Sequence, residues 1–177
     1  MFIDLLRRRR SIRKFTDRIP HAAAVDLIKE ALLRSPSSRG INPWEFIIVT
    51  DRRLLEKLAR SKRHGSEFIA GAPLAVVILG DETKSDVWIE DCSIAAINVQ
   101  ILAVDLGLGS CWAQIRNRQH DGALSAEAYV QQLLDIPSHL RVGMIIAIGY
   151  PDEIKKPVAF EKLGRGKIRH DRYRQKD

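Results

Sequence analysis

The sequence predicts a single α+β domain spanning residues 1–177, and three observations lead to this fold class. The length suits one hydrophobic core. Helical and strand patterns mix along the whole chain, with no internal repeat, low-complexity tract or linker between them. Residues 88–106 are apolar on nearly every face, which is typical of a helix buried inside the protein or at a subunit interface.

In the first half of the chain, short helices and strands are expected in turn. Residues 2–9 favour a short helix that leads into a basic turn. Apolar residues recur at helical spacing over 25–32, after a proline that suits a helix start and before a Ser-Pro pair that ends it. A β-branched and aromatic run predicts a strand at 46–49, and leucines mark a helix at 54–58. Residues 75–79 are expected to form a buried strand closed by a Gly-Asp pair.

The second half is organised around the long apolar helix at 88–106, which a glycine ends. Residues 110–115 are expected to form the next strand. The pattern over 125–134 is helical. Residues 142–148 indicate another buried strand, and a Gly-Tyr-Pro sequence stops it.

The chain is strongly basic, and its cations gather at the two ends. The formal net charge is +7 and the isoelectric point is about 9.7. Such a balance suits an anionic partner, and composition does not choose among nucleic acid, an acidic membrane surface and a phosphorylated ligand. The basic residues at the two ends are Arg7 to Arg10, Arg13, Lys14, Arg18, Lys162, Arg165, Lys167, Arg169, Arg172 and Arg174.

Several classes of protein are not expected. The first residues run straight into arginines and lack the apolar stretch of a signal peptide, and residues 92–104 are too short to span a bilayer. Cys92 and Cys111 stand far apart without a Cys-x-x-Cys pair, so reduced thiols of a cytosolic protein are expected. The histidines show no ligand spacing, so no metal site is expected.

The N-terminal basic run is the first candidate for a binding site. Arginine guanidinium groups and a serine hydroxyl bind phosphate through charge-assisted hydrogen bonds. If this segment is extended, Arg9, Ser11 and Arg13 point to the same side because side chains alternate along an extended chain. A solvated basic patch or a nucleic-acid contact is the alternative interpretation of the same run.

Three further segments are candidates for ligand binding. Residues 35–44 form a turn-rich loop between a helix and a strand, where ligand sites often lie. In residues 106–115, two glycines follow a helix instead of a strand, which argues against a dinucleotide fingerprint and predicts a helix C-cap. Lys167 and Arg169 supply two more cations, facing the same way if the tail is extended. A plain connecting loop and a frayed basic tail are the alternatives.

Taken in order, these segments resemble the nitroreductase family of FMN enzymes over nearly the whole chain. The shared motifs begin with residues 9–15, the Pro-Ser-Ser loop at 36–38 that ends in Pro-Trp-Glu-Phe, and an Ala-Pro pair before the strand at 75–79. They continue with Leu-Gly-Leu-Gly after the long helix, Ile-Gly-Tyr-Pro after the last strand, and the two cations of the tail. Each motif is weak alone, whereas the ordered set is specific.

The resemblance implies a mostly antiparallel sheet flanked by helices, in an intertwined homodimer with FMN at the subunit interface. Arg9 and Ser11, with the two tail cations, then hold the phosphate and ribityl end. Arg13 lies near flavin N1 and the C2 carbonyl, the backbone of Gln114 and Ile115 approaches N5, and the Pro-Ser-Ser loop comes from the partner chain. The implied cofactor-binding residues are Arg9, Arg10, Ser11, Arg13, Pro36, Ser37, Ser38, Gln114, Ile115, Lys167 and Arg169.

The resemblance also implies an enzyme that takes hydride from NAD(P)H and reduces a small organic acceptor such as a nitroaromatic or a quinone. The hydride chemistry belongs to the flavin, so no catalytic acid, base or nucleophile is expected from the protein. A cytoplasmic protein with no nucleic-acid or membrane partner is expected. Reductive dehalogenation, flavin fragmentation, and non-enzymatic binding of flavin or nucleic acid are the alternatives.

The chain departs from the family pattern in three places. It is shorter than the well-known members, and Gln114 replaces an acidic residue found in some of them. Residues 64–68 show no clear counterpart of the amide and lysine contacts near the flavin pyrimidine edge. These departures leave the physiological acceptor and the choice between NADH and NADPH open.

Overall fold

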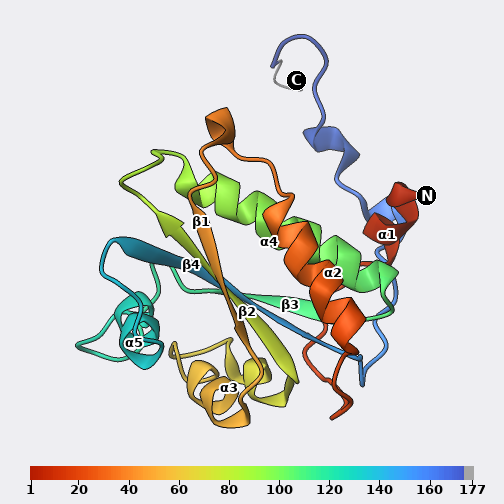
Figure 1. The fold of residues 1–177 in the computed structure, drawn as a ribbon. Helices are drawn as coiled ribbons and strands as arrows, with labels where there is room; N and C mark the ends of the chain where they lie inside the picture. The colour runs from red at the N-terminus through yellow and green to blue at the C-terminus, as the bar shows by residue number, and fades with distance from the viewer. Residues whose placement is uncertain (174–177) are drawn as a thin grey trace.

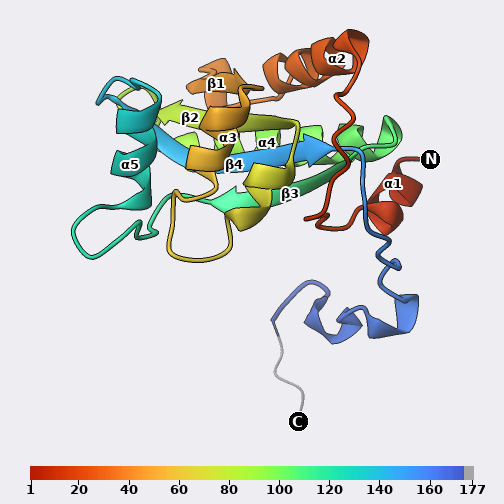
Figure 2. The ribbon, with the colours of Figure 1, turned by 90° about the horizontal axis from the view of Figure 1, so that it is seen from below.

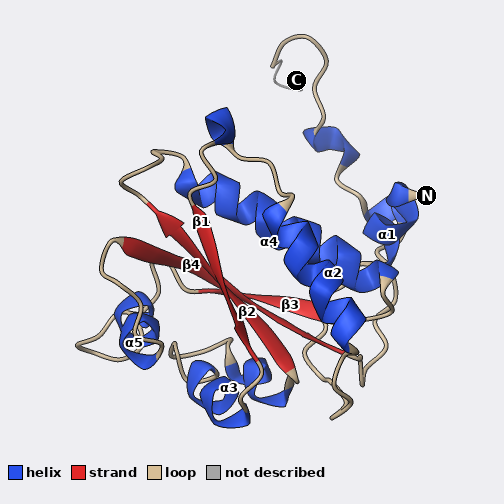
Figure 3. Ribbon diagram, viewed as in Figure 1, coloured by secondary structure: helices blue, strands red, loops and turns tan. Residues whose placement is uncertain are grey.

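A four-stranded sheet forms the centre of the protein (Figure 1, Figure 3). The computed structural model describes residues 1–173, so Arg174 lies outside the described residues. Neighbouring strands are antiparallel throughout, which confirms the expected α+β class and the mostly antiparallel sheet. In spatial order, the strands are β1 (Trp44–Val49), β2 (Leu74–Asp81), β4 (Leu140–Gly149) and β3 (Gly109–Gln114).

Each helix that the sequence predicts is present, with ends that differ by a few residues. The α-helices are α1 (Phe2–Arg8), α2 (Ala22–Leu33), α3 (Arg52–Leu58), α4 (Trp88–Asp105) and α5 (Ala126–Leu133). The sequence does not predict the short 3₁₀-helices, because three to five residues are too few to display a period. These are η1 (Ser38–Gly40), η2 (Glu67–Gly71), η3 (Phe160–Lys162) and η4 (Arg165–Lys167).

The strand β2 is longer than the sequence predicts. The expected closure by Gly80 and Asp81 is wrong, because both residues pair with β4. Gly80 stays in the sheet beneath the Trp88 ring of α4, where an added Cβ would lie 2.4 Å from Trp88 Cε3. The glycine therefore permits the close approach of an aromatic ring and does not mark a turn.

Helices cover both faces of the sheet (Figure 1, Figure 2). Side chains alternate along β2, so Val76 and Ile78 pack with α2 and α4 on one face. Ala75 and Val77 face α3, η2 and α5 on the other. The two central strands, β2 and β4, are almost fully buried, whereas β1 and β3 form the two edges.

The long helix α4 is buried on one side only within a single chain. The side against the sheet carries small residues, among them Ala95, Ala96 and Val99, which are fully buried. The opposite side carries Ile94 and Ile97, whose exposed fractions are 38% and 37%. A helix with an uncovered apolar side is typical of a subunit interface.

After β4, the chain leaves the body of the domain, and the segment with η3 and η4 projects away from the sheet in both views (Figure 1, Figure 2). This tail exposes large apolar side chains, including Ile154 at 98%, Phe160 at 63% and Ile168 at 66%. Isolated apolar side chains on such a tail have no core of their own to join. Within residues 1–173, no helix combines the length and apolar character needed to cross a membrane.

Candidate functional site

The N-terminal basic segment runs along the free edge of β3. Ser11 forms a parallel bridge with Ser110, and the Ile12 N–H donates to the Ser110 carbonyl at 3.0 Å. Ile12 is buried, so its neighbours Ser11 and Arg13 point to the opposite side of the extended backbone. The expected extended conformation of this segment is confirmed by these contacts.

The chain that follows β4 holds this segment in place. The Thr16 N–H donates to the Tyr150 carbonyl at 2.9 Å, and the Lys155 ammonium donates to the Ser11 carbonyl at 2.6 Å. The Glu153 carboxylate accepts hydrogen bonds from the main-chain N–H groups of Arg13 and the next residue. The hydrogen bond from the Arg13 N–H is the main cause that lowers the pKa of Glu153. These hydrogen bonds fix the main chain of the N-terminal basic segment and do not involve the guanidinium groups of its arginines.

The arginines of the segment have different surroundings. Arg9 and Arg13 form no ion pair among residues 1–173, and the Arg13 guanidinium lies 5.9 Å from the centre of the Phe68 ring. Arg10 instead donates to the Lys156 carbonyl. It also lines, with Arg8, a cavity of about 230 Å³ beside the end of α4. Arg10 therefore already has a protein partner, unlike Arg9 and Arg13.

The edge of β3 leaves main-chain groups open beside these arginines. The Ser110 carbonyl points away from β4, since it accepts from the basic segment. In an antiparallel pair this orientation repeats every second residue, so the Gln114 N–H also faces the free edge. The N–H of Ile115 instead donates to the Gly143 carbonyl at 3.2 Å. Of the two residues whose backbone is expected near flavin N5, Gln114 thus offers the open donor.

The Gln114 side chain is fixed by its neighbours. Its Oε1 accepts from Trp112 Nε1 at 3.0 Å, and its Nε2 donates to the Arg116 carbonyl at 3.1 Å. The amide group therefore links the edge strand to the first residues of the following loop. Because both polar atoms of the Gln114 amide are hydrogen-bonded, the end of β3 is held in one conformation. A rigid strand end suits the positioning of a planar ligand.

The Pro-Ser-Ser loop at 36–38 is held by polar side chains of α4. The buried Asp91 carboxylate accepts the Ser38 N–H at 2.8 Å, and Asn98 Nδ2 donates to Ser35 Oγ at 3.0 Å. Ser37 Oγ donates to Asn42 Oδ1 and accepts from the N–H of the same residue, both at 2.8 Å. The sequence analysis does not identify Asp91 and Asn98 as residues that hold this loop, and the signal for them is a polar side chain within an apolar helix.

The predicted site residues do not meet within one chain. The loop at 36–38 leads into β1, at one edge of the sheet, whereas the basic segment lies on β3, at the other edge. Lys167 lies in η4 and not in an extended segment, so the expected alternation with Arg169 is wrong. Arg169 donates to carbonyl groups of its own segment, Gly166 and Ile168. Within one chain, these parts therefore remain apart.

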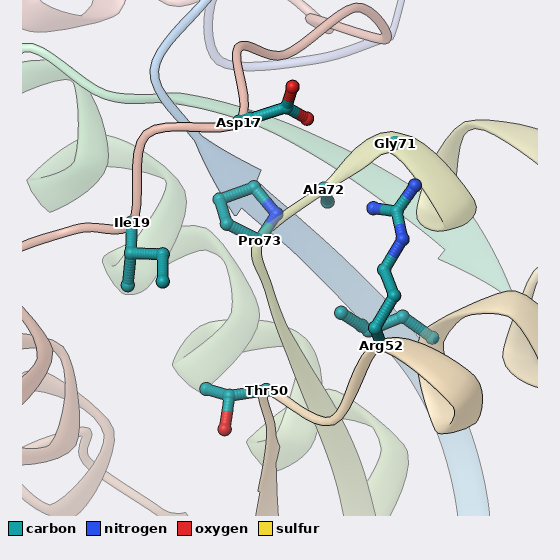
Figure 4. A pocket seen from close by; sticks show the side chains of 8 residues that line it. Asp17, Ile19, Thr50, Arg52, Gly71, Ala72 and Pro73 are labelled. Atoms are coloured by element: carbon teal, nitrogen blue, oxygen red, sulfur yellow. The ribbon is translucent and has the colours of Figure 1, made fainter.

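A separate cavity lies elsewhere and contains none of the predicted residues. Its volume is about 340 Å³, and it opens beside the starts of β2 and α3 (Figure 4). Asp17 and Ile19 face Thr50 and Arg52 across Pro73. The candidate site described above is instead an open surface along the edge of β3.

The close contact between β3 and the basic segment predicts the effect of one substitution. A Cβ at Gly109 would lie 2.8 Å from Ile12 Cβ, and neither backbone is free to move. We expect Gly109→Ala to displace the basic segment and to lower the free energy of unfolding by about 1–3 kcal/mol, as overpacking does. Urea denaturation measures the change. Gly71→Ala is the control, because no atom lies within 4 Å of the added Cβ. Equal free energies of unfolding for the two variants would contradict the close contact between Gly109 and Ile12.

Comparison with known proteins identifies relatives over most of the chain. A family model described as Nitroreductase family matches residues 6–64 and 59–150. An FMN-dependent nitroreductase from Clostridium difficile R20291 is 44% identical, with a TM-score of 0.95 over 97% of this chain and 99% of that one. A relative from Methanothermobacter thermautotrophicus, with a provisional name pairing NADH dehydrogenase with NAD(P)H nitroreductase, is 32% identical over 85% of this chain and 78% of its own.

A more distant neighbour shares the fold alone. Iodotyrosine deiodinase, in a structure with FMN and 3-iodo-L-tyrosine bound, is 21% identical with a TM-score of 0.79. The match covers 98% of this chain and all of the other. The same fold therefore serves more than one flavin chemistry.

Proposed function

The chain belongs to the nitroreductase family, and we propose that it is an FMN-dependent oxidoreductase that takes hydride from NAD(P)H and reduces a small organic acceptor. One observation carries the proposal. Ser11 and Arg13 point away from the core beside an open main-chain edge of β3, and the side chains of Arg9, Ser11 and Arg13 have no polar partner among residues 1–173. These three side chains are hydrogen-bond donors that have no acceptor within the described part of the chain.

The donor set suits a phosphorylated planar ligand. Arg9 and Ser11 would hold the phosphate, whose negative charge needs paired cations. Arg13 would lie beside the ring where negative charge collects on reduction, and Gln114 would offer its main-chain N–H. The bound flavin supplies the hydride chemistry itself. The role of the protein is to hold the flavin ring in one position, to supply positive charge opposite the phosphate and the reduced ring, and to exclude water.

The proposed enzyme is a homodimer in which each chain completes the site of the other. The loop at 36–38 and the basic segment lie at opposite edges of one sheet, so a second copy is needed to join them. Ile94 and Ile97 on the open side of α4 supply an apolar surface for that contact. The projecting tail, with Ile154, Phe160 and the cations of its end, is long enough to lie on the partner.

Flavin content and reduction test this function. We expect the purified protein to be yellow, to release FMN on denaturation, and to be reduced by NAD(P)H without oxygen. Reoxidation is then followed by stopped-flow absorbance with a quinone, a nitroaromatic, an enone and a halogenated phenol as acceptors. Fast reoxidation by the halogenated phenol alone would favour dehalogenation. Stoichiometric FAD, or no flavin uptake, would contradict the proposal.

A further inference from the structure

Two loops at one end of the sheet together form a strongly basic surface. The loop after α3 and the loop after β3 lie side by side in both views (Figure 1, Figure 2). The Arg63 N–H donates to the Gln119 carbonyl at 3.2 Å, and His120 Nδ1 lies 2.8 Å from the Arg60 carbonyl. We call this the two-loop basic surface, and its cations are Arg60, Lys62, Arg63, Arg116 and Arg118.

The two-loop basic surface has an excess of positive charge, although the Glu67 and Asp121 carboxylates lie close enough to interact with Lys62 and Arg63. None of its five cations forms an ion pair among residues 1–173. Both oxygens of the nearby Glu67 carboxylate accept the Gly65 N–H, Oε2 at 2.8 Å and Oε1 at 3.0 Å. Burial, and then the charge of Arg118, lowers the pKa of Lys62. Five cations held together beside two carboxylates leave a net positive charge, which favours the binding of an anion.

The two-loop basic surface begins where the candidate flavin site ends. Arg116 lies two residues after the end of β3, and its carbonyl accepts the hydrogen bond from the Gln114 side chain. On the side of the loop after α3, Lys62 and Arg13 both lie close enough to Cys111 for their charges to lower its pKa against the effect of burial. The open edge of β3 and the two-loop basic surface therefore adjoin, so that one elongated ligand could contact both.

The geometry points to the two-loop basic surface as the binding site for the phosphates of the dinucleotide hydride donor, with a preference for NADPH over NADH. This inference rests on the proposed function. The pyrophosphate carries about two negative charges, and the 2′-phosphate of NADPH adds ~1.5 to 2 more, which suits several unpaired cations. Lys62 and Arg118, one from each loop, lie close enough for their charges to interact and are the expected contacts of the 2′-phosphate.

A single-stranded nucleic acid suits this surface less well. Such ligands need exposed aromatic rings between the cations, on which bases stack. The nearby aromatic rings are already engaged: Tyr129 stacks on His120 at 4.0 Å between ring centres, and Trp88 lies 5.9 Å from the Arg116 guanidinium and is buried. The surface therefore offers charge without a stacking platform.

Binding of the oxidised dinucleotides tests the inference without any turnover. NADP⁺ and NAD⁺ are titrated by calorimetry into the FMN-loaded protein and into Lys62→Ala/Arg118→Ala. We expect the Kd of NADP⁺ to rise roughly tenfold or more, as charge-assisted contacts are lost, and that of NAD⁺ to rise less. The control, Lys29→Ala/Arg34→Ala, removes the same charge from α2 on the other face of the sheet. Equal NADP⁺ affinity in both double variants would overturn the inference.

A neutral hydride donor separates this inference from the proposed function. 1-Benzyl-1,4-dihydronicotinamide carries no phosphate, so we expect it to reduce the flavin at the same rate in the wild type and in Lys62→Ala/Arg118→Ala. If neither this donor nor NADPH reduces the wild-type flavin, the proposed function fails. If both donors reduce it and NADPH is unaffected by the substitutions, only the phosphate site fails. Binding of NADP⁺ to the wild type should also weaken with added salt, which needs no variant.

Discussion

Replacing Ile97 by aspartate is expected to convert the proposed dimer into monomers and to release FMN in the same step. Ile97 lies on the open side of α4, where 37% of it remains exposed in one chain. A carboxylate buried there without a partner would raise the free energy of the dimer by at least ~3 kcal/mol, which is more than roughly a hundredfold in Kd. In a two-fold symmetric dimer both copies carry the charge, so the effect is doubled.

Light scattering and flavin absorbance follow the two consequences of this substitution. Ile97→Val keeps the surface apolar and is the matched control, which should remain dimeric and yellow. FMN loss follows from dissociation because the loop at 36–38 no longer reaches the basic segment of the other chain. An Ile97→Asp protein that is monomeric but retains FMN would show that one chain suffices for binding. One that stays dimeric would place the interface elsewhere.

The second large effect is expected at Arg9. Arg9→Ala removes a charge-assisted contact to the phosphate, so FMN affinity should fall by about 1.5–3 kcal/mol, or roughly 10- to 150-fold. Arg13→Ala should act differently, because a cation beside the ring stabilises the reduced anionic flavin more than the oxidised neutral one. We expect a lower reduction potential and slower reduction by NAD(P)H, with a smaller change in FMN affinity.

Arg7→Ala is the control for both arginines, since the Arg7 guanidinium pairs with Asp4 at 2.9 Å on α1. FMN titration into apoprotein and spectroelectrochemical potentials measure the two expected effects. A random-sequence oligonucleotide is titrated into the same variants. If all three arginines affect oligonucleotide affinity equally and none affects FMN, the cluster binds nucleic acid and the flavoenzyme proposal is wrong.

The sequence alone was sufficient for the elements that rest on local periodicity. The helix at 25–32 and the strand at 142–148 can each be recognised from the pattern of apolar residues within the segment itself. Both are present, in α2 and β4. The expected extension of the basic segment also held, because buried Ile12 lies between two side chains that point away from the core. Local patterns fail where a distant residue decides, as at Gly80, whose place in β2 depends on the Trp88 ring.

Only the tertiary structure decided how the candidate site is distributed. The sequence names the loop at 36–38 and the basic run as site segments, but the strand order places them at opposite edges of the sheet. The two-loop basic surface is likewise invisible along the chain, since Lys62 and Arg118 are brought together by hydrogen bonds between two loops. Periodicity reports which side of an element is buried, whereas strand order and loop contacts join residues that are far apart in sequence.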